Sequence, residues 1–272
     1  YQITPKDVTI DVSDASKAYG ADDPAFTGKV TGLVSEGDLG TVTYKRTNTD
    51  EAVGTYEGVI TAEYTANGNY SVTVNNGDFT INKADGNVIN DPEGNPINGE
   101  DFTKVYDGTE LTTTAVPTYP EGTTVSYSTD GGQTWTATPP SRTDVGTTTV
   151  KVKAENPNYE TTEATYTLTV TPRPVTVKAD DKAKAYGEDD PEMTATVSGT
   201  IGSDTVSYTI GRDKGEDTGS YAITPSGDAA QGNYSVSFVP GTLTVVPQSI
   251  NPDDPTTPDP EDPDDPTTPD PE

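Results

Sequence analysis

Apolar and polar residues alternate along many short stretches of this chain. Tyr70-Ser-Val72-Thr-Val74 places three apolar side chains on one face of a strand and two hydroxyls on the other. Residues 8–12, 150–153, 166–170, 175–178 and 234–238 show the same period of two. This period is typical of strands with one buried and one solvated face, which antiparallel sheets commonly present. The pattern predicts an all-β protein made of small antiparallel modules.

Two motifs occur twice in the same order, which indicates homologous modules. Lys17-Ala-Tyr-Gly-Ala-Asp-Asp-Pro24 recurs as Lys184-Ala-Tyr-Gly-Glu-Asp-Asp-Pro191. Gly68-Asn-Tyr-Ser-Val72 recurs as Gly232-Asn-Tyr-Ser-Val236. Each predicted module has room for a small Ig-like sandwich, and a β-grasp-like sheet is the alternative.

The repeats and the Pro-rich stretches predict five parts of the chain. These are the end of an upstream module at residues 1–5, β modules at residues 6–83, 84–172 and 173–247, and a disordered acidic Pro/Thr-rich spacer at residues 248–272. The middle module diverges from its neighbours and carries Lys104-Val-Tyr-Asp-Gly-Thr109 at the place of their first motif. The first residues are assigned to an upstream module because Ile3 to Ile10 aligns without a gap with Val170 to Val177, where one module passes into the next.

Composition narrows the possible functions. With 45 Asp and Glu against 16 Lys and Arg the net charge is −29, which opposes binding to nucleic acid. Only 29% of the residues are hydrophobic, so one large core is excluded, and no apolar run is long enough to insert into a membrane. The absence of Cys and His excludes disulfides, thiol catalysis and zinc-finger sites. The expected partners are neighbouring modules of the same chain, and the expected state is a monomer.

The repeated motifs resemble a known family of domains. Ala18-Tyr-Gly20 with Asp22-Asp-Pro24, and Ala185-Tyr-Gly187 with Asp189-Asp-Pro191, are similar to the YGX-type MBG repeats of bacterial surface proteins. The middle module, through Lys104 to Thr109, resembles the YDG-type repeats of similar proteins.

The resemblance implies where the protein is located and the kind of protein it belongs to. Such repeats occur in tandem on secreted or wall-anchored bacterial adhesins, so it implies an extracellular location at the cell surface or cell wall. Together with the repeated modules and the Pro-rich junctions, it leads to the hypothesis of a structural stalk that presents a distal binding domain. The alternative is an adhesive module that binds a host glycan or matrix protein through exposed Tyr and Trp side chains.

Three aromatic residues are the candidates for ligand contact: Trp135, Tyr19 and Tyr186. Trp135 ends Ser128-Thr-Asp130-Gly-Gly132-Gln-Thr134-Trp135, which matches the Asp-box pattern of sialidases, and the pattern predicts a tight hairpin here. Because Tyr19 and Tyr186 recur at matching positions, packing within the module is the alternative role for them. An enzyme is not expected, since a Ser nucleophile lacks its usual His base.

No cofactor is expected, with Ca²⁺ as the one candidate. Its possible ligands are the paired acids Asp22, Asp23, Asp189 and Asp190, because Ca²⁺ prefers carboxylate oxygens. No loop of EF-hand pattern accompanies them, and adjacent acids are also common on solvated turns.

A covalent cross-link between Lys and Asn side chains is a further hypothesis, since Gram-positive surface modules sometimes contain one. Equivalent positions hold a Lys and an Asn in each module: Lys17, Lys104 and Lys184, with Asn69, Asn158 and Asn233. The alternative is that each Lys is exposed and each Asn belongs to an ordinary turn.

Overall fold

The computed structural model describes residues 1–248. The predicted spacer at residues 248–272 therefore lies outside the described residues, apart from Gln248. No helix of the described part is long and apolar enough to cross a membrane.

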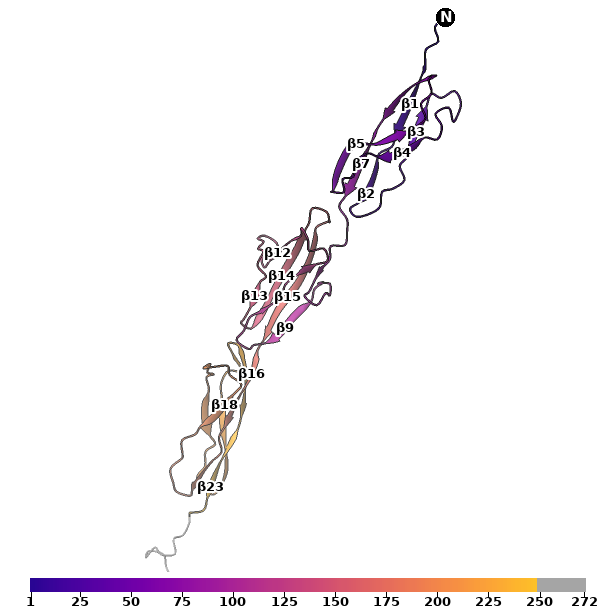
Figure 1. The fold of residues 1–272 in the computed structure, drawn as a ribbon. Helices are drawn as coiled ribbons and strands as arrows, with labels where there is room; N and C mark the ends of the chain where they lie inside the picture. Colours follow the sequence, from indigo (N-terminus) through magenta and orange to yellow (C-terminus); the bar gives the residue numbers. More distant parts are fainter. Residues whose placement is uncertain (249–272) are drawn as a thin grey trace, which may run out of the picture. The chain divides into compact units, whose positions relative to one another are not determined.

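Strands β1 to β7 form a sandwich of two sheets, called the first sandwich below (Figure 1). One sheet has the order β3-β1-β6, with β1 (Lys6–Val12), β3 (Gly28–Thr31) and β6 (Tyr70–Asn75). The other has the order β2-β7-β5-β4, with β2 (Ala15–Ala18), β4 (Thr43–Arg46), β5 (Gly54–Glu63) and β7 (Gly77–Asn82). Alternate apolar side chains of the two sheets meet in one core that includes Ile10, Ile60 and Phe79, all fully buried.

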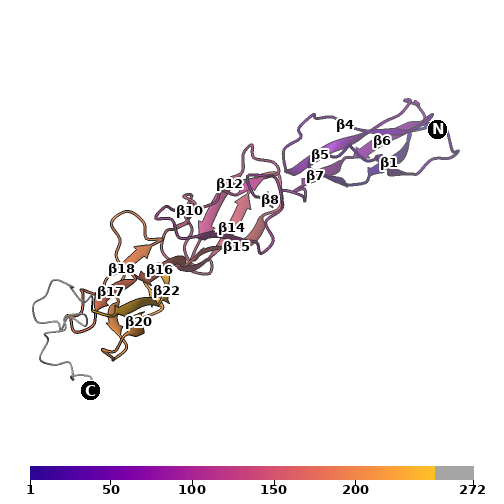
Figure 2. The same cartoon turned by 90° about the horizontal axis from the view of Figure 1, so that it is seen from below.

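The first and last strands of this sandwich change sheets together. β1 continues into β2 after Ser13 and Asp14, and β6 continues into β7 after Asn76. β1 pairs with β6 in parallel, and β2 pairs with β7 in parallel, as Figure 2 lets the reader follow for β1, β6 and β7. The sheets are therefore mixed: these two pairings differ from the antiparallel arrangement that the sequence predicts, whereas β1 with β3, β4 with β5 and β5 with β7 are antiparallel as predicted. A period of two shows which face of a strand is buried but not the direction of its partner.

The crossover requires a glycine where the two strands pass closest. A Cβ atom on Gly77 would lie 2.5 Å from the carbonyl oxygen of Ser13, and one on Gly241 would lie 2.6 Å from that of Ala179. An acid side chain secures each crossing. Asp14 Oδ1 accepts a hydrogen bond from the Asp78 amide, and Asp181 Oδ1 accepts one from the Thr242 amide, both at 2.8 Å.

Strands β16 to β23 repeat this plan and form the last sandwich. One sheet has the order β18-β16-β22-β21, with β16 (Arg173–Ala179), β18 (Ala195–Ser198), β21 (Ala230–Gln231) and β22 (Tyr234–Val239). The other has the order β17-β23-β20-β19, with β17 (Lys182–Ala185), β19 (Thr209–Arg212), β20 (Gly219–Ser226) and β23 (Gly241–Val246). The same two parallel pairings recur, β16 with β22 and β17 with β23.

The middle region is organised differently. Its main sheet has the order β12-β14-β15-β9, with β9 (Asp101–Val105), β12 (Thr124–Ser128), β14 (Gly146–Glu155) and β15 (Thr162–Thr171). Two short pairs accompany it, β8 (Ile89–Asn90) with β11 (Val116–Pro117) and β10 (Leu111–Thr112) with β13 (Ser141–Arg142). Tyr166, Leu168 and Val150 are the fully buried centre of its core.

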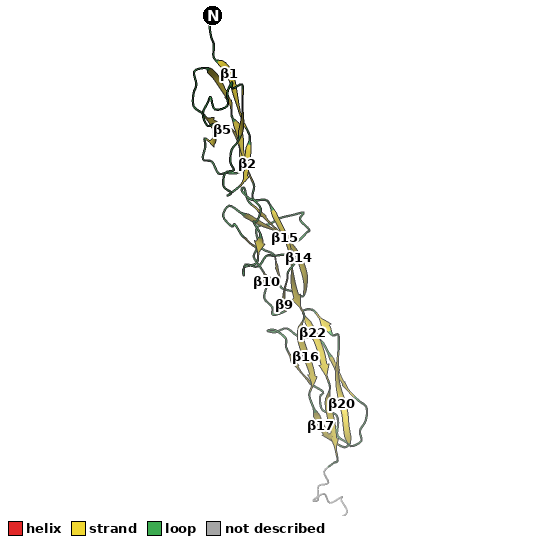
Figure 3. Cartoon of the chain, turned by 90° about the vertical axis from the view of Figure 1, so that its right-hand side faces the viewer, coloured by secondary structure: helices red, strands yellow, loops and turns green. Residues whose placement is uncertain are grey.

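The described residues contain strands and loops and no helix (Figure 3). The prediction of an all-β fold with Ig-like sandwiches is confirmed, and two sheets facing one core do not match the β-grasp-like alternative. Contacts group the chain into two compact units. One holds residues 1–102, 111–142 and 147–168, and the other holds residues 103–110, 143–146 and, within the described part, 169–248. The division into modules at residues 6–83, 84–172 and 173–247 stays a prediction.

Candidate functional site

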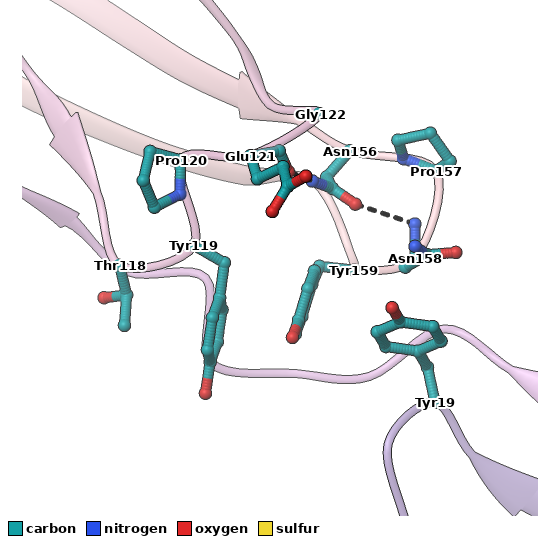
Figure 4. Close-up of a pocket in the computed structure, with 10 residues that line it drawn as sticks. All are labelled: Tyr19, Thr118, Tyr119, Pro120, Glu121, Gly122, Asn156, Pro157, Asn158 and Tyr159. Carbon is teal, nitrogen blue, oxygen red and sulfur yellow. Dashed lines mark hydrogen bonds between the residues drawn. The ribbon is translucent and has the colours of Figure 1, made fainter.

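Three tyrosines form an aromatic pocket in the first compact unit (Figure 4). The rings of Tyr119 and Tyr159 are stacked, with centroids 4.3 Å apart and planes 9° apart. Tyr19 meets Tyr159 edge to face, with centroids 5.6 Å apart and planes at 76°. Stacked and edge-to-face arrangements are the two that the charge distribution of aromatic rings favours.

Backbone hydrogen bonds position these rings. The Tyr19 amide donates to the carbonyl of Asn82 at 2.8 Å, which ties the turn after β2 to the end of β7. Two residues further along the chain, the Ala84 amide donates to the carbonyl of Asn158 at 3.0 Å, and the Glu160 amide donates to the carbonyl of Ala84 at 2.9 Å. Tyr159 therefore lies between two bonded residues, and its ring faces Tyr19.

A buried asparagine fixes the loops that carry Tyr119 and Tyr159. Asn156 is 5% exposed, and its Nδ2 donates to the carbonyl of Glu121 at 3.0 Å and to Thr123 Oγ1 at 2.8 Å. Its Oδ1 accepts a hydrogen bond from the Asn158 amide at 2.8 Å. The pocket wall is thus preorganised by one side chain that uses both ends of its amide.

The pocket has a volume of about 560 Å³ and combines ring faces with polar groups. Its lining residues are Tyr19, Thr118, Tyr119, Pro120, Glu121, Gly122, Asn156, Pro157, Asn158 and Tyr159. Burial, and then the neighbouring phenols, raise the pKa of Tyr159 above its ordinary value. Aromatic faces beside hydroxyl and carboxylate groups can hold a ring that is apolar on one face and polar at its edge.

The structure brings only one of the three predicted aromatic residues into this pocket. Tyr19 is half-buried there, with Tyr119 and Tyr159, neither of which the sequence singled out. Tyr186 is 49% exposed and lines a separate cavity of about 430 Å³ with Asp217, Thr218, Pro247 and Gln248. Tyr119 lies in a loop without a repeated counterpart, so the sequence held no signal for it.

Trp135 lies in a hairpin that uses its polar group internally. Its Nε1 donates to the carbonyl of Gly132 at 3.0 Å, and Lys153 Nζ lies 4.8 Å from the ring centroid. Asp130 Oδ1 accepts from the Ser128 hydroxyl at 2.7 Å and from the Thr134 amide at 2.9 Å. The Thr134 hydroxyl also donates to Asp130 Oδ2 at 2.6 Å. This bond first, and then the others, lower the pKa of Asp130. The predicted tight hairpin is confirmed, and the ring of Trp135 is half-buried.

A cluster of four charged residues explains the Lys and the second Asp of the repeated motif. In the first sandwich, Asp23 lies 2.8 Å from Lys17 Nζ and 3.2 Å from Arg46 Nε, and Glu51 contacts the same two cations. The Lys17 and Arg46 side chains are only 5% and 8% exposed. The Arg46 guanidinium lies 4.7 Å from the ring centroid of Phe79, so the cluster closes one end of the core.

The last sandwich repeats the cluster. Asp190 lies 2.8 Å from Lys184 Nζ and 2.7 Å from Arg212 Nε, and Glu216 lies 2.5 Å from each cation. The two cations, Arg212 first, lower the pKa of Asp190 to about 2. The sequence did not indicate that Arg46 and Arg212 are equivalent.

The candidate Ca²⁺ ligands divide between two surroundings. Asp23 and Asp190 bond to the cations of the two clusters, whereas Asp22 and Asp189 are exposed on the same turns. Among residues 1–248, no group of three or more His, Cys, Asp or Glu side chains is arranged to hold a metal ion.

The hypothesis of Lys–Asn cross-links is wrong for the two repeats. Lys6 pairs with Tyr70, so Asn69 lies at the start of β1, whereas Lys17 lies in β2 beyond the other end of β1. Seven strand residues separate the two ends by about 20 Å. In the last sandwich Lys184 bonds to Asp190 and Glu216, while Asn233 Nδ2 donates to Asp144 Oδ1 at 2.9 Å. Lys104 of the middle region instead bonds to Asp107 at 2.7 Å.

These observations define a chain of tandem β-sandwich repeats. The repeated motif supplies the Lys and one Asp of an ion-pair cluster at one end of each repeat's core. The MBG domain (YGX type) family matches residues 8–80 and 175–244, together more than half of the chain. The chain belongs to this family, and the matched regions are repeat modules of the adhesin-type extracellular class. The YDG-type resemblance of the middle region lies outside the matched residues and stays a prediction.

No curated protein matches the chain. Solved structures with similarity include the four N-terminal Ig domains of Dscam1 isoform 9.44 (11% identity, 68% of this chain and 51% of that chain, TM-score 0.26). They also include Drosophila N-cadherin EC1-4 (11% identity, 91% and 76%, TM-score 0.27) and human CDH23 EC21-23 (14% identity, 89% and 100%, TM-score 0.28). The chain spans about half the length of the Dscam1 structure. At these TM-scores the likenesses carry no argument about function.

Proposed function

We propose that this chain is a structural stalk of a bacterial extracellular surface adhesin, without enzymatic activity, that holds a distal binding domain away from the cell. One observation carries the proposal. The Tyr of the repeated motif, Tyr19, packs edge to face on Tyr159 of the next region and is not presented as a free surface ring. A motif that joins successive modules serves a spacer, because the stiffness of a tandem array depends on contacts between neighbours.

The stalk predicts that these contacts restrict motion between the first sandwich and the middle region. Since the chain has no Cys, spin labels on Glu36→Cys and Glu163→Cys, both exposed, report the distance between the two parts without interference. We expect a narrow distance distribution in the parent chain and a broad one after Tyr159→Ala. Trp135→Ala is the matched control and should leave the distribution narrow. Equal widths in parent and Tyr159→Ala would contradict the stalk.

The pocket supports a second candidate function, binding of a glycan. Tyr119 is 43% exposed and stacked on Tyr159, and Glu121 and Asn158 stand beside the rings. Exposed ring faces next to hydrogen-bonding groups suit the apolar face and hydroxyl edge of a sugar.

A glycan and mucin panel separates the two functions. Binding that is weakened at least tenfold by Tyr119→Ala and kept by Trp135→Ala assigns the site to the pocket. The opposite result assigns it to Trp135, and loss of binding only with EDTA assigns it to Ca²⁺ at the paired acids. If the parent chain binds nothing at high micromolar concentration, glycan binding is excluded and the stalk is the function that is left.

A further inference from the structure

Two loops of the middle region cover one end of the last sandwich. These loops, residues 103–110 and 143–146, belong to the same compact unit as the last sandwich. Tyr106 meets Tyr234 edge to face, with centroids 5.6 Å apart and planes at 88°. Gly108 lies over Ile201, so close that a Cβ on Gly108 would be 3.7 Å from Ile201 Cγ2. The result is an apolar contact centred on Tyr234, which is 6% exposed.

An asparagine completes this contact with directional bonds. Asn233 Oδ1 accepts a hydrogen bond from the Val145 amide at 2.8 Å, and its Nδ2 donates to Asp144 Oδ1 at 2.9 Å. Tyr234, Ile201 and Asn233 together are called the occupied socket below. It receives a ring, a glycine and an Asp-Val dipeptide from the middle region.

The loop that enters the socket is rigid by its own bonds. Asp107 Oδ1 accepts from the Thr109 amide at 2.9 Å and from Lys104 Nζ at 2.7 Å. These bonds, that of Lys104 first, lower the pKa of Asp107. Gly108 takes φ +78°, where a side chain would be strained. The Lys-Val-Tyr-Asp-Gly-Thr motif therefore encodes a preformed loop that presents Tyr106.

The first sandwich contains the same three positions, held in the same way. Tyr70, Val34 and Asn69 correspond to Tyr234, Ile201 and Asn233, and are called the open socket. The Val34 amide donates to Tyr70 Oη at 3.0 Å, as the Ile201 amide does to Tyr234 Oη at 3.1 Å.

The hydroxyl of each of these two tyrosines also forms a hydrogen bond with an acidic side chain. Each phenol donates to an equivalent carboxylate, Tyr70 to Asp38 and Tyr234 to Asp204. The geometry that holds the ring in place is thus formed without any loop docked on it. Burial, and then the bond to Asp204, raise the pKa of Tyr234, and the bond to Asp38 is the first cause that raises the pKa of Tyr70.

The two sockets differ in exposure. Val34 is 74% exposed and Asn69 is exposed, whereas Ile201 and Asn233 are half-buried. Tyr70 is half-buried, whereas Tyr234 is buried. Val34 and Tyr70 are therefore the more exposed equivalents of the two residues, Ile201 and Tyr234, that the loop with Tyr106 and Gly108 contacts in the last sandwich.

We propose that the open socket binds the Tyr-Asp-Gly loop of a β module built like residues 84–172. The tyrosine of that loop packs on Tyr70, its glycine lies over Val34, and an Asp-Val dipeptide of the same module bonds to Asn69. Asn69 can accept through Oδ1 and donate through Nδ2, which are the two bonds that Asn233 makes with the Asp-Val dipeptide of the middle region. The proposal depends on the likeness between the occupied and the open socket. It is independent of whether the chain is a stalk or a glycan-binding module.

Thiol labelling tests the proposal directly, because the chain has no Cys of its own. In the parent chain, Val34→Cys should react at the rate of a free thiol and Ile201→Cys at least tenfold more slowly. In an extended chain, a second copy of residues 84–170 replaces residues 1–3, so that it runs into Thr4 as the native copy runs into Thr171. Labelling of Val34→Cys in the extended chain should then slow at least tenfold. Tyr106→Ala in the added copy, or Asn69→Ala, should restore the fast rate.

A second variant guards against an added copy that does not fold. Residues 6–83 replace residues 173–248, which places the first sandwich directly after the native middle region. Val34→Cys in the transplanted sandwich should be protected like Ile201→Cys in the parent chain. Fast labelling in both the extended and the transplanted chain, with Ile201→Cys still protected in the parent, overturns the proposal. Protection of Val34→Cys in the parent chain that rises with protein concentration and persists after Tyr106→Ala would also overturn it, because the occupant would then be a different surface of a second copy.

Discussion

The first and last sandwiches share one strand plan but differ in what completes their cores. The first has a single core cluster that runs from Val8 to Ile81 and includes the large side chains of Phe79 and Leu39. The buried residues of the last fall into two smaller clusters, one around Val177 and Tyr234 and one around Ile223 and Leu243. Tyr106 packs against the former cluster.

A small sandwich can thus take part of its core from a neighbouring loop. Phe79 fills the core of the first sandwich. The equivalent position of the last sandwich, in β23, holds the smaller Leu243. The last sandwich has its Tyr234 covered by Tyr106, and the first leaves Tyr70 partly open. Modules of this size bury little apolar surface, so a covering loop changes stability measurably.

Both sandwiches share the close crossover of their strands, and we expect substitutions there to destabilise the chain most. Gly77→Val and Gly241→Val each place a side chain against a backbone carbonyl at the sheet crossover, 2.5 Å and 2.6 Å from the oxygen at Cβ alone. We expect each to lower the free energy of unfolding by about 3 kcal/mol or more, since backbone cannot move aside as a side chain can. Urea unfolding followed by circular dichroism measures this.

Gly211→Ala is the matched control for these two substitutions. Gly211 also lies in a strand, β19, but no atom lies within 4 Å of its Cβ position. It should leave the unfolding midpoint nearly unchanged. If Gly77→Val unfolds at the parent midpoint, the close crossover is not what the structure depends on.

An intermediate effect is expected from the charged clusters, as a dependence on pH. The cations hold the pKa of Asp190 at about 2 and also lower that of Glu216 and, in the first sandwich, of Glu51. Because these values lie below those of the unfolded chain, the unfolded state takes up protons first as the pH falls. The stabilisation is therefore complete above about pH 5 and is lost as the pH falls towards 2.

Asp190→Asn isolates the contribution of one cluster. It should lower the urea midpoint of the last sandwich at pH 7 and make that midpoint less dependent on pH between 5 and 2. Asp23→Asn is the equivalent change in the first sandwich. Parallel pH profiles for the parent and Asp190→Asn would show that the cluster contributes nothing to stability.

The sequence was sufficient for the fold class because alternation and repetition are local signals. Period-two stretches such as residues 70–74 identified the strands, and the Ser128 to Trp135 pattern identified a hairpin whose bonds are all local. Strand direction was not available from the same signal, so the parallel pairing of β1 with β6 was missed. Side chains alternate between the two faces of a strand in the same way whether its partner is parallel or antiparallel.

The candidate site was predicted only in part because it depends on contacts between distant segments. The repeat points to Tyr19, but its partners Tyr119 and Tyr159 lie about 100 and 140 residues away, and no repeat indicates that either of them meets Tyr19. Arg46 was missed for the same reason, since nothing in the spacing from Asp23 indicates that a strand brings them together. Long-range pairs of this kind appear only when the strand register is known.

The smallest expected effect addresses the difference between the two sockets. Tyr234→Phe removes a hydroxyl that accepts from the Ile201 amide and donates to Asp204 beneath a docked loop, whereas Tyr70→Phe removes the same bonds at an open surface. Water can replace the lost partners more easily at the exposed Val34 than at the half-buried Ile201, so the lost hydrogen bond costs more in the last sandwich. We expect Tyr234→Phe to lower the thermal midpoint by a few degrees and Tyr70→Phe by clearly less. Amide hydrogen exchange at Ile201 and Val34 reports each site separately, and equal acceleration at both would remove the distinction between an occupied and an open socket.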